Sequence, residues 1–296
     1  MAETKPAIGF IGIGLMGLPM TRRLLSRGYG VTVYDIAREK LGPAVEAGAV
    51  AVRNPAEVAA RSDLVLLCVL DTAAVEAVVF GPDGVIASAA PDKLLVDHST
   101  TTATLTREMA ERLRRETGMG WVDAPVSGGP PAAAEGQLTI MAGGEPGDIE
   151  RVSLVMADLG QRFTHMGPVG AGQATKMVNQ VIVGSTFAVL AEALILAEKA
   201  GIDAARVPEC LAGGYADGTM LQRMYPRMVE RAYTPPAGYA RQLLKDLDMV
   251  HDLAKAVQAP TPMTAQAANL YRLAVARGLA ELDTIAVLKL YDKDPV

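Results

Sequence analysis

The chain has 296 residues, of which half are apolar and 4% aromatic, and its 28 basic and 33 acidic residues give a formal net charge of −5. Intrinsic disorder is excluded, because it requires low hydrophobicity and a high net charge. Nucleic-acid binding is not expected, because it relies on a basic surface and aromatic stacking platforms. The length suggests two domains, since single hydrophobic cores stop growing near about 250–300 residues.

The cysteines and the apolar segments predict a cytoplasmic protein without a membrane partner. Cys68 and Cys210 are the only cysteines, so no disulfide framework can form. Glu3 and Pro6 stand where a signal peptide needs a basic region. The uncharged run Met177–Ala191 is shorter than the roughly 20 residues that a bilayer requires.

The first half of the chain alternates short apolar runs with segments of helical length. Strands are predicted over Ala7–Ile11, Val31–Tyr34, Leu64–Val69, Leu94–Val96, Trp121–Val122 and Leu138–Met141. Helices are predicted over Met16–Arg27, Glu39–Ala47, Pro55–Arg61, Ala73–Val79 and Leu105–Thr117. This alternation, with nearly continuous apolar strands, predicts an α/β fold with a Rossmann-type, doubly wound, mostly parallel sheet covered on both faces.

After about Gly170 the pattern changes to helices alone. They are predicted over Val169–Lys199, Asp203–Leu211, Leu221–Arg231, Ala240–Gln258, Met263–Arg277 and Thr284–Tyr291. Glycine and proline interrupt the chain within His165–Gly170. We therefore expect a first domain over residues 1–166 and an all-helical C-terminal domain over residues 167–296.

A G-x-G-x-x-G pattern, Gly12, Gly14 and Gly17, directly follows the first predicted strand and opens a helix. In a dinucleotide site the first glycine permits a tight turn, the second lets the backbone approach a pyrophosphate, and the third allows close helix–strand contact. The helix N-terminus adds amide donors and a positive dipole. The glycines alone would also fit an ordinary strand-to-helix turn.

Asp35 strengthens the dinucleotide hypothesis, because it ends the second strand eighteen residues after Gly17. A carboxylate there accepts hydrogen bonds from the adenosine ribose hydroxyls, so residues 1–166 are predicted to bind a dinucleotide. The same charge disfavours a 2′-phosphate, which makes NAD the expected cofactor. Arg38 is either a solvated arginine at a helix start or a partner for that phosphate, so NADP stays open.

With this unit in place, the chain resembles the β-hydroxyacid dehydrogenase family, which includes 3-hydroxyisobutyrate dehydrogenase and tartronate semialdehyde reductase (2-hydroxy-3-oxopropionate reductase). The resemblance rests on Gly9–Met20, Asp123–Gly129, Gly170–Gln180 and Lys245–Leu247, in the family's order. One position departs from the pattern. Many members have two adjacent asparagines where this chain has Asn179 and then Gln180, which leaves the role of Gln180 open.

The resemblance implies a metal-independent oxidoreductase that moves hydride between NAD(P) and a short 3-hydroxy acid or its semialdehyde. It implies cofactor contacts by Gly12, Gly14, Leu15, Met16, Gly17, Asp35, Leu70, Asp71, Thr100 and Lys245. Ser127, Gly128, Gly129 and Gln180 are the implied substrate residues. Residues 167–296 would then bind the small carboxylic acid and mediate assembly into a homodimer or homotetramer.

The three histidines, His98, His165 and His251, are scattered and lack metal-ligand spacing, so a metal site is not expected. A metal-free dehydrogenase needs a side chain that supplies or takes the alcohol proton. His98 stands at the end of a predicted strand, but the family places its chemistry elsewhere. The sequence therefore favours another group.

Lys176 is the predicted general acid/base. Asn179 and Gln180 lie three and four residues further on and share its helix face, so an amide can hold the ammonium and the substrate oxygen in register. Fifteen uncharged residues follow Lys176, which is unusual for a surface lysine. Burial and a cationic nicotinamide would lower its pKa toward neutrality. The predicted catalytic residues are Lys176 and Asn179.

Two alternatives stay open beside this hypothesis. Imine reductases share the architecture but generally lack a lysine at the position of Lys176. A non-catalytic dinucleotide-binding protein would have no need of a proton donor, yet Ser127, Lys176 and Asn179 are all present.

Overall fold

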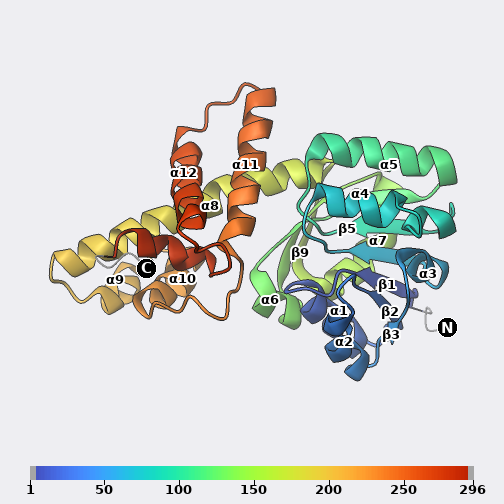
Figure 1. Cartoon of the computed structure of the whole chain (residues 1–296), viewed down its shortest axis with the longest axis horizontal. Coiled ribbons are helices and arrows are strands. Elements are labelled where there is room, and N and C mark those ends of the chain that lie inside the picture. The colour runs from blue at the N-terminus through green and yellow to red at the C-terminus, as the bar shows by residue number, and fades with distance from the viewer. Residues whose placement is uncertain (1–4, 293–296) are drawn as a thin grey trace. The chain divides into compact units, whose positions relative to one another are not determined.

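A computed structural model describes residues 5–292 of the chain (Figure 1). Glu3, one of the two residues that argue against a signal peptide, lies outside the described residues. The chain divides into two compact units, Met1–Lys176 and Met177–Val296. The division falls within helix α8 (Ala171–Lys199), so this helix contributes residues to both units.

The first unit is built on one nine-stranded sheet. Its strands are β1 (Ile8–Ile11), β2 (Val31–Tyr34), β3 (Val50–Ala51), β4 (Leu64–Leu67), β5 (Leu94–Asp97), β6 (Gly120–Asp123), β7 (Val126–Ser127), β8 (Leu138–Gly143) and β9 (Gly160–Gly167). They lie in the order β3-β2-β1-β4-β5-β6-β8-β7, with β9 beside β8. All pairs are parallel except those of β8 with β6 and β7. The order in which strands are added reverses between β1 and β4, because β2 and β3 follow on one side of β1, and β4, β5 and β6 on the other. Doubly wound folds bind ligands at this point, at the carboxyl ends of the strands.

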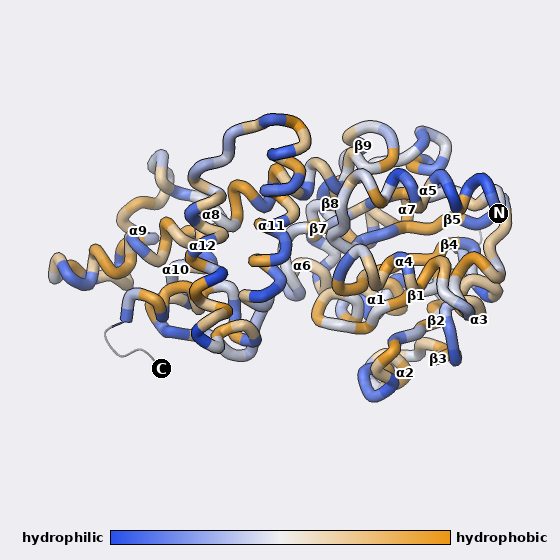
Figure 2. Tube along the Cα trace, turned by 45° about the horizontal axis from the view of Figure 1, so that its top comes forward, coloured by the Kyte–Doolittle hydropathy of each residue, from blue (hydrophilic) through white to orange (hydrophobic). Residues whose placement is uncertain are grey.

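Helices cover both faces of this sheet. They are α1 (Gly17–Ser26), α2 (Gly42–Glu46), α3 (Pro55–Ala60), α4 (Thr72–Phe80), α5 (Ala103–Thr117), α6 (Gly129–Glu135) and α7 (Pro146–Leu159), with 3-10 helices η1 (Arg38–Leu41) and η2 (Val85–Ser88). Successive residues of one strand enter different cores, since Phe10 packs in one cluster and Ile11 in the other. Burial on both sides explains why most residues of the central strands are apolar (Figure 2).

The second unit contains helices. After α8 come η3 (Ala204–Arg206), α9 (Val207–Leu211), α10 (Thr219–Val229), α11 (Ala240–Ala256), α12 (Pro262–Ala276) and η4 (Thr284–Leu290). Their shared core includes Leu194, Tyr225 and Tyr271. Within residues 177–292 the one strand-like pairing is an isolated bridge between Tyr239 and Asp283. The predicted fold class, a mostly parallel Rossmann-type sheet followed by a helical unit, is confirmed.

Six elements of the first unit are absent from the sequence prediction, namely β3, β7, β9, α6, α7 and the 3-10 helix η2. Strand β9 is mostly exposed and carries polar residues such as Gln161 and Arg162, so no apolar run marks it. Helix α7 is different. Val152, Val155 and Leu159 recur at helical spacing and are buried, so the sequence did contain the signal for this helix.

Helix α8 is long and apolar enough to cross a membrane by those two criteria alone. Of its most apolar 18-residue window, 44% is buried inside the protein. The core helices of globular proteins pass the same test, so length and composition do not assign α8 to a bilayer.

The N-terminus of α8 is capped by a carboxylate from a distant strand. Gly170 precedes the helix with φ +89° and has no side chain to act as a cap. Asp123, at the end of β6, supplies it, since Oδ1 accepts from the Gly170 N–H at 2.7 Å and Oδ2 from the Gln173 N–H at 2.8 Å. A Cβ on Gly172 would lie 2.6 Å from the Asp123 carbonyl oxygen, so the approach requires glycine. Negative charge at a helix N-terminus is favourable.

Burial of Asp123 nevertheless dominates its titration. Desolvation raises the pKa of this carboxyl from 3.8 to about 6, against the lowering effect of the backbone N–H donors. A group whose pKa is raised on folding stabilises the fold fully below its unfolded pKa, and that contribution is lost as the pH rises through the folded pKa.

We therefore expect the free energy of unfolding of the wild type, relative to an Asp123→Asn variant, to fall by about 2 kcal/mol between pH 4 and pH 7, since one pKa unit corresponds to about 1.4 kcal/mol. Urea denaturation of both proteins at several pH values measures this difference. Parallel pH profiles for the two proteins would contradict the assignment.

Candidate active site

The turn between β1 and α1 requires two of the three motif glycines on steric grounds. Gly12 has φ +95°, and a Cβ there would lie 2.3 Å from the Cys68 carbonyl oxygen. A Cβ on Gly17 would lie 1.8 Å from the Gly12 carbonyl oxygen. A Cβ on Gly14 would meet nothing within 4 Å, so its backbone faces open space. The turn thus leaves room for a ligand beside Gly14 and the start of α1.

Asp35 holds this turn in place. Its side chain is buried, with Oδ2 accepting from the Ile13 N–H at 2.7 Å and Oδ1 from the Ala37 N–H at 2.8 Å. The carboxylate therefore joins the glycine turn to the end of β2. Each oxygen retains a further lone pair, so the predicted contact with ribose hydroxyls is compatible with this structural role.

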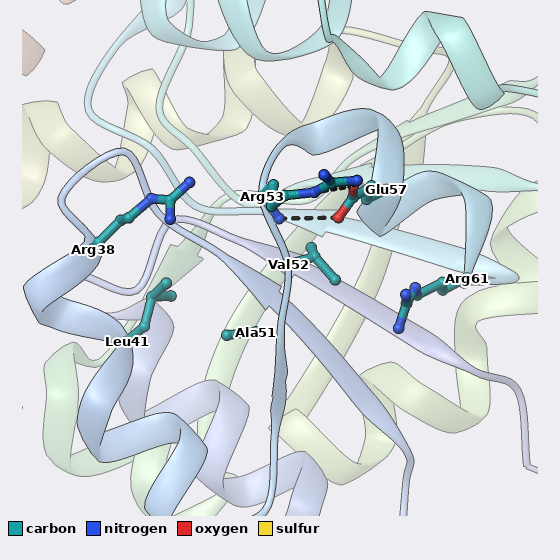
Figure 3. Close-up of a pocket in the computed structure, with 7 residues that line it drawn as sticks. All are labelled: Arg38, Leu41, Ala51, Val52, Arg53, Glu57 and Arg61. Carbon is teal, nitrogen blue, oxygen red and sulfur yellow. Dashed lines mark hydrogen bonds and ion pairs between the residues drawn. The ribbon is translucent and has the colours of Figure 1, made fainter.

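A positively charged pocket lies near the carboxyl ends of β2 and β3. Its volume is about 460 Å³, and it is lined by Arg38, Leu41, Ala51, Val52, Arg53, Glu57 and Arg61 (Figure 3). Arg53 donates from Nε to Oε1 of Glu57 at 2.6 Å. Arg38 makes no hydrogen bond or ion pair with the residues that the structure describes. The pocket holds three guanidinium groups and one carboxylate, so it favours an anion.

The ends of β4 and β5 carry three further predicted cofactor residues. Asp71 caps α4, with Oδ1 accepting from the Ala74 N–H at 2.9 Å, while Leu70 is half exposed. Thr100 follows β5. The two loops are joined, because the Val69 N–H donates to Oγ of Ser99 at 2.9 Å. The structure thus brings these positions to neighbouring strand ends.

Lys176 and the predicted substrate loop meet in the first unit. The lysine side chain is 8% exposed, and its Nζ donates to the Val126 carbonyl oxygen at 2.8 Å. Ser127, Gly128 and Gly129 follow directly. Gly128 and Gly129 have φ +129° and +72°, conformations that favour glycine. An ammonium group and a glycine turn that can offer backbone amides are therefore adjacent.

In the second unit, a chain of side chains runs from α8 to α11. Asn179 donates from Nδ2 to Oε1 of Gln180 at 2.7 Å, and Gln180 donates from Nε2 to Oδ2 of Asp246 at 2.6 Å. Lys245 Nζ lies 3.1 Å from the other Asp246 oxygen. Because an ionised carboxylate only accepts, Gln180 must present its amide nitrogen to Asp246 and its oxygen to Asn179. This order leaves Oδ1 of Asn179 available as an acceptor.

This chain gives Gln180 a definite role, since its longer arm reaches Asp246. It also gives Lys245 a carboxylate partner on its own helix. Asp248, two residues after Asp246 on α11, pairs instead with Arg272 at 2.5 Å.

His98 is a buried structural residue. It is 2% exposed, and its Nδ1 lies 2.7 Å from the Ala124 carbonyl oxygen. Burial lowers its pKa to about 4, so the ring is neutral at neutral pH and Nδ1 carries the donated hydrogen. Within residues 5–292, no group of three or more His, Cys, Asp or Glu side chains is arranged to hold a metal ion.

Three residues of this region were missed by the sequence prediction, Asp123, Gln173 and Asp246. Asp123 and Gln173 stand inside the segments that carry the family resemblance, and Asp246 follows Lys245. The contact of Asp123 with Gly170 spans 47 residues. No spacing rule connects residues so far apart in the chain.

Models of known protein families match both parts of the chain. Residues 7–167 match the model for the NAD binding domain of 6-phosphogluconate dehydrogenase. Residues 170–291 match the model described as NAD-binding of NADP-dependent 3-hydroxyisobutyrate dehydrogenase. The two matches together span both units.

Relatives align over nearly the whole chain. The chain is 36% identical to 2-hydroxy-3-oxopropionate reductase of Escherichia coli (strain K12), over 95% of this chain and 96% of that protein. It is 34% identical to 2-(hydroxymethyl)glutarate dehydrogenase of Eubacterium barkeri, over 98% and 96%. The crystal structure of 3-hydroxyisobutyrate dehydrogenase from Salmonella typhimurium superposes with a TM-score of 0.88 at 28% identity, covering 97% of this chain and 100% of that one. The chain therefore belongs to the family of NAD(P)-dependent β-hydroxyacid dehydrogenases, as the sequence motifs predict.

Proposed function

We propose that this dehydrogenase transfers hydride between a nicotinamide and a short 3-hydroxy acid or its semialdehyde, with Lys176 as the general acid/base. The observation that carries the proposal is the position of the Lys176 ammonium. It is buried and bonded to the carbonyl of Val126, the residue before Ser127. We assign dinucleotide binding to residues 1–166, which also supply the loop Ser127–Gly129 to the substrate, and the remaining substrate contacts and assembly to residues 167–296.

The relatives' names support the substrate class. 2-Hydroxy-3-oxopropionate, 2-(hydroxymethyl)glutarate and 3-hydroxyisobutyrate each carry the reacting oxygen on a carbon attached to the carbon that bears a carboxylate. In our proposal the Ser127 hydroxyl and the backbone amides of Gly128 and Gly129 bind that carboxylate. Gly128 and Gly129 have no side chain to block its approach to the backbone.

Lys176 carries out the proton transfer in our proposal. A bound nicotinamide supplies or takes the hydride, and the glycine turn with its open space at Gly14 fits such a cofactor. During reduction, Lys176 donates a proton from Nζ to the carbonyl oxygen as negative charge develops there. During oxidation, the same nitrogen takes the alcohol proton.

Asn179 orients this ammonium in our proposal. It lies three residues after Lys176 on α8, so the two side chains share a helix face. The chain through Gln180 to Asp246 engages the amide nitrogen of Asn179 as a donor. Its Oδ1 is then the atom that can accept from the ammonium or the substrate hydroxyl.

Both cofactors fit the site that we propose. Asp35 suits the ribose of NAD, while Arg38 lies three residues further on, without an ion pair to a described residue, in a pocket rich in guanidinium groups. We infer that NAD is bound through Asp35 and that Arg38 lets the protein accept NADP as well.

A face of α8 supports assembly into a homodimer or homotetramer. Val178, Ile182, Val189 and Leu196 recur at spacings of four and seven residues and are 60%, 61%, 53% and 70% exposed. Such a row of exposed apolar side chains on one helix face is typical of a surface covered by a second copy. Cys68 and Cys210 are both free thiols, which suits the proposed cytoplasmic location.

Replacing Lys176 by Ala should lower kcat by about 10²–10⁴-fold, the range for loss of a general acid/base. Binding of the reduced cofactor, measured by its fluorescence, should stay close to normal. Lys199→Ala, at the exposed end of the same helix, is the matched control. Full activity of the Lys176→Ala protein on semialdehydes, or preferred turnover of cyclic imines by the wild type, would rule out the proposal.

Replacing Arg38 by Ala should raise the KM for NADPH about tenfold or more while the KM for NADH changes little, because hydrogen bonds to charged groups contribute about 1.5–3 kcal/mol. Steady-state kinetics with both cofactors measures the two constants. Arg223→Ala is the matched control, since Arg223 is exposed on α10 and does not line this pocket. An equal effect of Arg38→Ala on both cofactors would refute its role in discrimination.

Introducing charge on the exposed face of α8, as in the double variant Ile182→Lys/Val189→Lys, should dissociate the oligomer because two ammonium groups would have to be buried. Light scattering after size exclusion gives the mass. Val257→Lys, at a similarly exposed residue after α11, should leave the mass unchanged. A wild-type protein that is already monomeric would end this part of the proposal.

A further inference from the structure

Gln173 bonds the main chain on both sides of Thr100. It lies in the first turn of α8 and is fully buried. Its Oε1 accepts from the Thr101 N–H at 3.0 Å, and its Nε2 donates to the Ser99 carbonyl oxygen at 2.8 Å. One side-chain amide therefore fixes the backbone that flanks the predicted cofactor residue Thr100.

Gln173 is itself fixed by the sheet. Its backbone N–H donates to the Asp123 carboxylate, which also holds Gly170. One turn later, Lys176 donates to the Val126 carbonyl, three residues after Asp123. The first turns of α8 are thus bonded to the last residue of β6 and to the segment that follows it. Gln173 extends from this anchored turn to the loop after β5.

The loop after β5 is also bonded to its neighbour. Oγ of Ser99 accepts from the Val69 N–H, at the end of β4. A continuous series of bonds consequently runs from the predicted cofactor loops, through the Gln173 amide, to the helix turn that carries Lys176. All of its members lie within the first unit.

We propose that Gln173 is a positioning residue that sets the register between the cofactor-contacting loop Ser99–Thr101 and Lys176. This inference rests on the proposed function, because it concerns the relative placement of hydride and proton transfer. Reaction requires the reacting atoms about 3–3.5 Å apart, and a displacement of about 1 Å can lower the rate about 10²-fold. Both halves of the amide are needed, since Thr101 requires an acceptor and Ser99 a donor.

Two substitutions separate these requirements. Gln173→Met fills similar space but bonds neither backbone group. Gln173→Glu keeps an acceptor for Thr101 and, while ionised, places an oxygen against the Ser99 carbonyl. When that carboxyl is protonated it regains a donor, so lowering the pH should restore the wild-type bonding pattern.

The readouts are kcat, the primary isotope effect with 4-deuterated reduced nicotinamide, and the dissociation constant of the cofactor. At pH 8 both variants should show kcat lowered about 10–100-fold and a raised isotope effect, because hydride transfer becomes rate-limiting. The dissociation constant of the cofactor should stay within about threefold of the wild-type value. For Gln173→Glu, kcat and the isotope effect should approach wild-type values toward pH 5.5.

Other groups near Gln173 titrate or carry charge, so the wild type is measured at every pH. They are Asp123, which accepts from its N–H, Asp97, which accepts from the Ser99 N–H, His98, which follows Asp97, and Lys176, one turn along α8. Gln266→Met, at an exposed position of α12, is the matched control.

Wild-type kcat and isotope effect in both variants would overturn the proposal, as would weaker cofactor binding with an unchanged hydride-transfer rate. If Gln173→Met does not fold, Gln173→Glu decides alone, and a pH profile identical in shape to that of the wild type overturns the inference. Lys176→Ala is assayed in parallel. An inactive Lys176→Ala protein beside fully active Gln173 variants would refute only the positioning role, whereas an active one would refute the proposed function.

Discussion

The carboxylate of Asp123 at the N-terminus of α8 is the interaction on which the candidate site depends. Helices begin with backbone N–H groups that lack partners, and here the residue before the helix is a glycine with no side chain to supply one. Asp123 accepts two of these N–H groups from the end of β6. A strand of the sheet thereby fixes the start of the helix that carries Lys176.

Burying the Asp123 carboxylate costs free energy, and the residues around it must therefore fit it closely. The carboxyl is removed from water, and its raised pKa reports that the charged form is disfavoured by burial. Gly143 and Gly172 both lie against it, and a Cβ on either would approach an Asp123 oxygen to within 2.8 Å. Perturbed carboxyls of this kind gather at functional sites more often than elsewhere, although ion-pair networks also produce them. Here the carboxyl serves to place other groups.

The sequence predicted most of the fold because its signals are local. Strands β1, β2, β4, β5, β6 and β8 appear at the apolar runs that predicted them, and the switch to helices follows from the loss of those runs. Strand β9 escaped because it is exposed and polar, whereas α7 was readable from its apolar spacing. Within the site, Gly12 and Gly17 were predictable from a short motif. The amide chain from Asn179 to Asp246 and the contacts of Gln173 were not, because they join residues whose proximity depends on tertiary packing.

In the mechanism that we propose, the ammonium of Lys176 delivers the proton that accompanies hydride transfer to an acid semialdehyde. The most direct measurement is a single-turnover experiment in which reduced-nicotinamide absorbance is followed after mixing with 2-hydroxy-3-oxopropionate. It compares the wild type with Lys176→Ala in the absence and presence of methylamine. We expect rapid oxidation of the cofactor by the wild type, almost none by the variant, and a partial return of the rate as the amine replaces the missing group. Oxidation by the variant at the wild-type rate without any amine would contradict this mechanism.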